Sequence, residues 1–170
     1  MASIDRIRHE RTPDGEQILI RPWETPEQRK AILNAMAAAG ADEPVVRALA
    51  GAIAAPLAGA SDRAVLQALL SGVFATVVYR PDTPSDLDFY QPAERTLRPV
   101  PGNERSPLTG QPKGVGDCED LATLLVCLCL CLGITARVKW IEQKGSPLNH
   151  VAALVLFDDQ RPDDPRAWRC

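Results

Sequence analysis

The sequence predicts an α+β fold, with helices in its first half and an antiparallel sheet near its end. Apolar residues at helical spacing and helix-start signals dominate residues 25–79. A proline-rich stretch follows, and an apolar helical run then precedes two segments rich in β-branched residues. Because the helices come first and the strands later, rather than in alternation, the pattern favours α+β over α/β.

Length, composition and charge narrow the class of protein. The 170 residues are enough for one structural domain, and a hydrophobic content of 45% is that of an ordinary globular protein. A net charge of -3 with scattered Lys and Arg argues against nucleic-acid and membrane-surface binding. The N-terminus is charged where a signal peptide is apolar, and the longest apolar run, residues 121–132, is too short for a membrane span. We therefore expect a cytoplasmic protein with neither nucleic-acid nor membrane partners.

Residues 1–79 form a part that we expect to be helical. Thr25, Pro26 and Gln28 have the residue types of an N-cap, a first-turn proline and a capping-box partner. Gly40 is expected to end the helix that they begin. Later start and stop signals predict two more helices in this part. The three expected helices cover residues 25–40, 43–54 and 62–79.

Residues 80–113 differ in kind, because seven of the fifteen prolines fall in them. Proline fixes φ and lacks an N–H donor, so we expect an extended connection without regular secondary structure. A loop of this length in a small domain is either functional or disordered. Since this segment leads directly to Cys118, we favour the functional reading and expect the connection to line a cleft beside that cysteine.

Residues 114–170 carry the remaining elements. A helix is expected from Cys118 to Leu132, with Gly133 ending it. Two strands separated by a polar turn follow, and the last residues are expected to form a polar turn and the start of a third strand. These segments cover residues 135–143, 144–149, 150–157 and 158–170.

Cys118 is the candidate nucleophile because of its position at the start of a helix. Asp117 fits the N-cap and Asp120 the capping-box position, so both support the helix start. The positive end of the helix dipole lowers the pKa of a thiol there, whereas Asp117, Glu119 and Asp120 act in the opposite direction. A nearby imidazolium would supply the remaining activation.

The chain contains two histidines, and one of them suits this role. His9 lies in the charged N-terminal segment and is expected at the surface. His150 heads the second strand, where its side chain can face the end of a helix that packs on the same sheet. Cys118 and His150 then form a nucleophile with its general base; alternatively, they are one more buried thiol and an ordinary turn residue.

Three further cysteines lie inside the same helical run, and we interpret them as core. Residues two apart on a helix point to different sides, so reduced thiols are expected rather than disulfides. Zinc usually binds close cysteine pairs on loops, whereas Cys127 and Cys131 share one helix face. No metal site is therefore expected from Cys127, Cys129 and Cys131.

The segments "GDCEDLATLLVCLCLCLGITARV" and "NHVAALVLF" together resemble the transglutaminase-like superfamily, whose core is papain-like. In that family a Gly-Asp-Cys-(Asp/Glu)-Asp segment opens the central helix, and its cysteine is the nucleophile. A Leu-Gly-Ile turn ends the helix, and the general-base histidine starts a later strand. The resemblance covers residues 114–168 and assigns these roles to Cys118 and His150.

The same resemblance extends to the approach segment "VVYRPDTPSDLDFYQPAERTL", which looks like that of short bacterial and phage members. It implies that Gln91 lines the cleft or contributes to an oxyanion hole; the alternative is an ordinary loop glutamine.

The family places an orienting aspartate on the strand after the histidine strand. The aspartates after His150 fall in the expected turn, at the far end of the strand; they are Asp158, Asp159, Asp163 and Asp164. Trp168 fits the aromatic residue that precedes the family's aspartate, so the orienting carboxylate is expected just beyond Cys170. The chain is therefore a fragment, a dyad oriented by another group, or a catalytically idle member.

The function predicted from the sequence is cysteine-dependent acyl transfer on peptide or carboxamide bonds. Hydrolysis by a peptidase or amidase is favoured over amine cross-linking, with a protein or peptide substrate and no cofactor. The alternative is a non-catalytic structural or binding module on the same fold, with the proline-rich segment as its interaction surface. Such a module would bind phage structural proteins and be associated with the virion.

Overall fold

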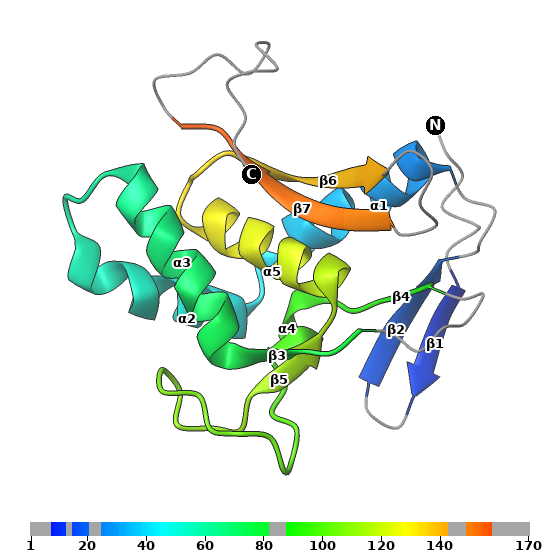
Figure 1. The fold of residues 1–170 in the computed structure, drawn as a ribbon, viewed down its shortest axis with the longest axis horizontal. Helices are drawn as coiled ribbons and strands as arrows, with labels where there is room; N and C mark the ends of the chain where they lie inside the picture. Colours follow the sequence, from blue (N-terminus) through cyan, green and yellow to red (C-terminus); the bar gives the residue numbers. More distant parts are fainter. Residues whose placement is uncertain (1–7, 13–14, 21–24, 82–87, 143–148, 158–170) are drawn as a thin grey trace.

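Residues 8–12, 15–20, 25–81, 88–142 and 149–157 are described here from a computed structural model of the chain (Figure 1). The helices are α1 (Pro26–Gly40), α2 (Pro44–Ala54), the 3₁₀ helix η2 (Ala55–Leu57), α3 (Asp62–Thr76), α4 (Ala93–Thr96) and α5 (Cys118–Cys131). The strands are β1 (Arg8–Thr12), β2 (Gly15–Ile20), β3 (Val77–Tyr79), β4 (Asp88–Tyr90), β5 (Gly114–Gly116), β6 (Ala136–Glu142) and β7 (Asn149–Val155). Helices and small sheets together make the fold α+β, as the sequence predicts.

The strands form three small sheets rather than one. β1, β2 and β4 form an antiparallel sheet, in which Ile18 pairs with Tyr90. β3 and β5 form a parallel pair, which joins Tyr79 to Gly116. β6 and β7 form an antiparallel pair, in which Ile141 lies opposite His150. Two of these sheets, the β3–β5 pair and the β6–β7 pair, contact α5.

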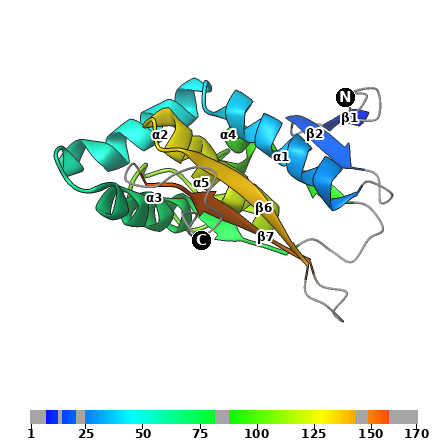
Figure 2. The same cartoon turned by 90° about the horizontal axis from the view of Figure 1, so that it is seen from above.

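Helix α5 lies at the centre of the molecule. It contacts α1, α2, α3 and α4 as well as β6 and β7. Figure 2 shows it beneath the β6–β7 pair, with α3 on one side and α1 on the other. Its residues 121–129 are all buried, which fits a helix that is apolar around its whole circumference. None of the helices in the described part of the chain is long and apolar enough to span a membrane.

Capping signals fix where the helices begin and end. Thr25 is the N-cap of α1 and forms a capping box with Gln28, as the sequence predicts. α2 begins after Glu43, with proline in its first turn. Gly133 has a φ of +76°, a backbone conformation that favours glycine, and it ends α5 close to the predicted residue.

Asn34 of α1 fixes the position of the β6–β7 pair on the helices. Its Oδ1 accepts a hydrogen bond from the Val138 N–H at 2.8 Å, and its Nδ2 donates to the Val138 carbonyl at 3.2 Å. One side chain thus satisfies both backbone groups of a residue in β6, an outer strand of its sheet. The amide anchors the strand pair to α1.

The first 79 residues are not wholly helical, so that prediction needs correction. β1 and β2 form an antiparallel pair over residues 8–20, and α3 ends at Thr76, where β3 begins. The β-branched run Thr76, Val77 and Val78 favours a strand over further helix. Pro-Asp-Gly at residues 13–15 is a common turn sequence, and it was the available signal for the β1–β2 pair.

The proline-rich connection also contains regular structure, contrary to the prediction. β4 and α4 lie within it, and Arg105 forms an isolated bridge with Pro112. The prolines are unevenly spaced, and between Pro84 and Pro99 only Pro92 occurs. That window is long enough for a short strand and one helical turn, and Pro92 is compatible with the start of α4.

Candidate active site

The start of α5 places Cys118 as the first residue of the helix. Asp117 is the N-cap, and its Oδ1 accepts hydrogen bonds from the N–H groups of Glu119 and Asp120 at 3.1 and 3.2 Å. In return, the Asp117 N–H donates to Asp120 Oδ2 at 3.3 Å. This is the capping box that the sequence predicts, and it fixes the direction in which the chain enters the helix.

Two glycines in β5 allow the chain to approach α4 and α5 closely. A Cβ on Gly114 would lie against the Thr96 carbonyl of α4, at a distance that no side chain tolerates. A Cβ on Gly116 would lie 2.8 Å from the Asp120 Cβ. The glycine-rich approach to Cys118 is therefore a requirement of close backbone contact.

Cys118 and His150 line the same cavity, which we call the Cys118 cavity and which has a volume of about 260 Å³. His150 is exposed near the start of β7, and the next residue, Val151, directs its backbone N–H toward the Cys118 thiol. The remaining walls come from α3, β3, α5 and β7. Both residues that the sequence proposes as nucleophile and base therefore line this cavity, and their pairing stays a prediction.

The thiol of Cys118 is held in its protonated form. Burial raises its pKa to about 12, and Glu119 adds to this through both a hydrogen bond and its negative charge. Sγ donates to Glu119 Oε2 at 2.9 Å. These effects outweigh the helix dipole, so of the two opposing influences named from the sequence, the acidic one prevails, and burial adds to it. No hydrogen bond joins Cys118 to His150 among the contacts of the described residues.

Asp120 is fully buried beneath the helix start, and Gln91 is its main partner. The Gln91 backbone N–H and its Nε2 donate to the two Asp120 oxygens, each at 2.8 Å. Burial raises the pKa of Asp120 to about 7, although these hydrogen bonds act to lower it. The pKa of Asp117 is raised for the same first reason, with the charges of Asp120 and Glu119 adding to it.

Gln91 is therefore turned toward Asp120. Its Nε2 also donates to the Val115 carbonyl at 3.4 Å, and its Oε1 accepts from Arg95 at 3.0 Å. It lines a separate cavity of about 450 Å³ together with Arg95 and Arg98. In this arrangement Gln91 binds Asp120, which is a member of the capping box. Both N–H donors of its side-chain amide are engaged in hydrogen bonds.

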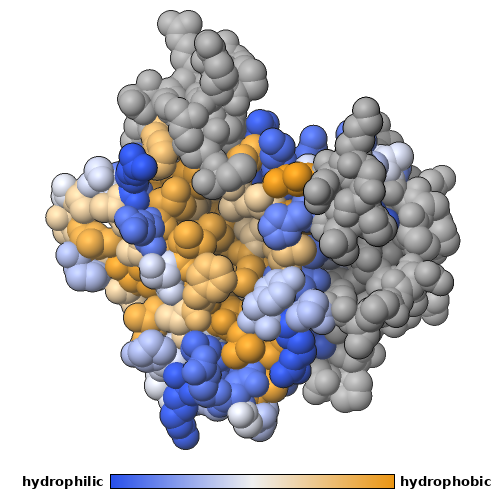
Figure 3. Space-filling model, viewed as in Figure 1, coloured by the Kyte–Doolittle hydropathy of each residue, from blue (hydrophilic) through white to orange (hydrophobic). Residues whose placement is uncertain are grey.

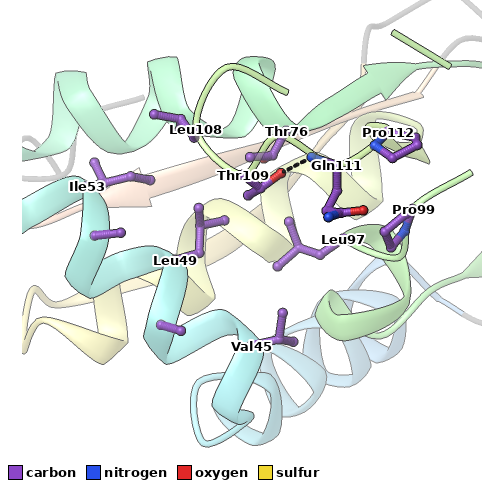
Figure 4. Close-up of a pocket in the computed structure, with 12 residues that line it drawn as sticks. Val45, Leu49, Ile53, Thr76, Leu97, Pro99, Leu108, Thr109, Gln111 and Pro112 are labelled. Atoms are coloured by element: carbon purple, nitrogen blue, oxygen red, sulfur yellow. Dashed lines mark hydrogen bonds between the residues drawn. The ribbon is translucent and has the colours of Figure 1, made fainter. Parts of the chain in front are cut away.

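A third cavity, of about 400 Å³, lies between α2 and the proline-rich connection (Figure 4). Val45, Leu49 and Ile53 of α2 face Leu97, Pro99 and Leu108 across it. It contains no titratable side chain. The described residues of the connection line this cavity and the Gln91 cavity, and none of them lines the Cys118 cavity, for which the sequence proposed them.

The other cysteines serve as structural residues of α5. Cys118, Cys127, Cys129 and Cys131 are all free thiols. The Cys127 and Cys131 thiols donate to the Ala37 and Ala41 carbonyls at the end of α1, at 3.3 and 3.1 Å. Across the described residues, no three His, Cys, Asp or Glu side chains are grouped so that they could hold a metal ion.

Several residues named from the sequence lie outside the part that the structure describes. These are the four aspartates that follow His150, Trp168 and Cys170; of His9, only the backbone, in β1, is described.

Sequence reasoning named Glu119 only as a source of negative charge and did not foresee that it binds the thiol. Phe74 lies within the helix predicted over residues 62–79, but nothing in the sequence placed it at the wall of the Cys118 cavity. The adjacency of Glu119 to Cys118 in the sequence was a signal for the hydrogen bond to the thiol. The position of Phe74 depends on how α3 packs relative to β7, which no local sequence pattern encodes.

Comparisons with known proteins identify no relative of this chain. No protein-family model, no curated protein and no solved structure matches the chain.

Proposed function

We propose that the chain is a cysteine-dependent acyl-transfer enzyme of the transglutaminase-like superfamily, with a papain-like core. The observation that carries the proposal is that Cys118 and His150 line one cavity. The order of elements supports it, because the cysteine begins a buried helix that packs on an antiparallel strand pair, and the histidine lies near the start of the second strand. The resemblance of the sequence assigns the same two roles.

The proposed chemistry begins with attack of Cys118 Sγ on a carbonyl carbon. His150 accepts the thiol proton as the S–C bond forms, and the carbonyl electrons move to oxygen. The Cys118 backbone N–H is a suitable donor for that oxygen, because the capping box uses those of Glu119 and Asp120. His150 then gives its proton to the leaving amine as the C–N bond breaks, and water or another amine releases the acyl group.

Glu119 determines the resting state of this proposed site. The thiol donates to Glu119 and has a raised pKa, so the mechanism uses a neutral thiol and a general base rather than a preformed thiolate. His150 must replace Glu119 as the acceptor of the thiol proton when substrate binds. No residue of the described part of the chain is assigned to orient His150, so the proposed mechanism is written with the Cys118–His150 pair alone.

We favour water as the acyl acceptor, which makes the enzyme a peptidase or amidase acting on a protein or peptide. No cofactor enters the mechanism. An amine acceptor would give cross-linking instead, with the same first step.

The test is labelling with a peptide-like electrophile, read by mass spectrometry of the intact chain and of its peptides. We expect one label on Cys118 in the wild-type chain, none in Cys118→Ala, and at least about a hundredfold slower labelling in His150→Ala, the lower end of what a general base contributes.

The matched control is Cys131→Ala, because Cys131 is also a free, partly exposed thiol. Its loss should leave the rate at Cys118 unchanged. Labelling that proceeds equally well in His150→Ala contradicts the proposed catalytic pair.

A non-catalytic module on the same fold is the second candidate. Two observations favour it: the protonated thiol of Cys118, and the apolar cavity that the proline-rich connection forms with α2 (Figure 4). Such a module would use the connection to bind other proteins, phage structural proteins among them. It predicts that Cys118 is inert toward the peptide-like electrophile.

A further inference from the structure

The Cys118 cavity is walled almost entirely by apolar side chains. α3 contributes Leu70 and Phe74, and β3 contributes Tyr79. None of its lining residues is Asp, Glu, Lys or Arg. A charged group that entered the cavity would lose water without gaining a partner of opposite sign, which is strongly unfavourable.

The same three side chains are also exposed to solvent. Leu70 is 43% exposed, Phe74 56% and Tyr79 54%. Figure 3 shows apolar side chains gathered on the face over α3, α5 and β7, with hydrophilic residues around them. Large apolar side chains clustered around a cavity mark a binding surface more often than scattered ones do.

The size and position of the cavity limit what it holds. Its volume of about 260 Å³ is below the roughly 300–1,000 Å³ of pockets for drug-sized ligands. A carbonyl carbon must come within about 3–3.5 Å of Sγ to react. Leu70, Phe74 and Tyr79 line the same cavity as Cys118, so they are the side chains available to contact a substrate side chain next to that carbonyl, and the volume suits one large side chain.

We infer that the acyl donor is a peptide with a large, uncharged, apolar side chain beside the attacked carbonyl, of leucine or phenylalanine type. Leu70, Phe74 and Tyr79 are the residues that select it. This inference rests on the proposed function, since it concerns the substrate of the same site.

The experiment compares five peptidyl electrophiles that differ only in the side chain next to the reactive carbonyl: glycine, leucine, phenylalanine, lysine and glutamate. Second-order rates of Cys118 labelling are measured for each on the whole chain. We expect leucine and phenylalanine to react at least about tenfold faster than glycine, as is typical of apolar pockets. Lysine and glutamate should react more slowly than glycine.

Phe74→Ser tests the wall, and Leu108→Ser is its matched control. The two side chains are similarly exposed, at 56% and 51%, and Leu108 lines the other apolar cavity. Circular dichroism establishes that both variants are folded. Phe74→Ser should reduce the ratio of the leucine rate to the glycine rate, whereas Leu108→Ser should retain it.

The outcomes separate this inference from the proposed function. Equal rates for all five electrophiles, with labelling that still requires His150, overturn the inference alone. Labelling of Cys118 that does not require His150 overturns the proposed function. A leucine preference that Phe74→Ser leaves intact overturns the assignment of the selecting residues.

Discussion

Cys118 is subject to opposing influences from its immediate neighbours. The helix start and the Val151 N–H favour its thiolate, while burial and Glu119 favour the thiol. Because Sγ donates to Glu119 Oε2 at 2.9 Å, the carboxylate holds the proton on sulfur. Glu119 therefore lowers the reactivity of the Cys118 thiol.

Replacement of Glu119 by glutamine should make Cys118 more reactive. The substitution removes the negative charge that raises the thiol pKa. Because thiolate fraction rises and intrinsic nucleophilicity falls as the pKa drops, we expect about a threefold faster alkylation for each pKa unit lost. The measurement is the rate of iodoacetamide labelling of Cys118 at pH 8.

Glu104→Gln is the control, because Glu104 is exposed and pairs with Lys113 in the proline-rich connection. It should leave the alkylation rate unchanged. A Glu119→Gln chain that reacts no faster than wild type would show that the charge of Glu119 does not keep the thiol protonated.

The buried carboxyls of Asp117 and Asp120 should make the chain less stable as pH rises. An unfolded aspartate has a pKa of about 3.9. In the folded chain burial raises the pKa of Asp120 to about 7 and that of Asp117 to about 9. Between these limits the folded chain binds more protons, so the free energy of unfolding falls with increasing pH. This stabilising contribution is complete below pH 4, roughly, and is lost through the folded pKa values.

Urea unfolding at pH 5, 7 and 9, followed by circular dichroism, measures this dependence. Asp117→Asn should flatten it, because asparagine keeps an N-cap acceptor and removes one titrating group. Stability that increases from pH 5 to pH 9 in the wild-type chain would mean that these carboxyls do not titrate as described.

Among the elements, the β3–β5 pair is the most sensitive to a small change. Gly114→Ala should lower the free energy of unfolding by about 1–3 kcal/mol, because the added Cβ meets the Thr96 carbonyl. Gly51→Ala in α2 is the matched control, since nothing lies within 4 Å of its added Cβ. It should raise stability by about 0.5–1 kcal/mol. Thermal or urea unfolding of the two variants measures both effects, and equal stabilities would contradict the close contact at Gly114.

The sequence predicts the elements whose signals are local. Capping residues mark the starts of α1 and α5, and both helices begin at the predicted residues. β6 and β7 follow from their β-branched residues. The pairing of β4 with β2 was missed because about seventy residues separate the two strands, and no periodicity records such a pairing. The β1–β2 pair, in contrast, had a local signal in Pro-Asp-Gly.

In the candidate site, too, local signals were predictable and features that depend on tertiary packing were not. Residue types and resemblance identified Cys118 and His150, and the capping box followed from Asp117 and Asp120. The environment of the sulfur could not be predicted, because burial and the rotamer of Glu119 decide its pKa. The position of Gln91 depends on how the connection folds against α5.

At the scale of the whole molecule, α5 is the element on which the others pack. Leu128 is 0% exposed in the middle of α5. Leu128→Ala should lower the free energy of unfolding by about 2–5 kcal/mol, because it leaves a cavity in the common core. Val45→Ala, at a side chain that is 48% exposed, should change stability by no more than about 0.5 kcal/mol. Urea unfolding followed by circular dichroism compares them, and similar losses in both would contradict a single core around α5.

The parallel pairing of β3 with β5 closes the base of the proline-rich connection, and Lys113 reinforces this closure by donating to the Phe74 carbonyl at 3.2 Å. The two ends of the connection are thus held together before the chain reaches Cys118. Its outer turn around Thr109 and Gly110 is held by its own hydrogen bonds to Arg105 and Ser106 and does not line the Cys118 cavity. A substitution in that turn therefore alters the cavity beside α2 without a direct contact to Cys118.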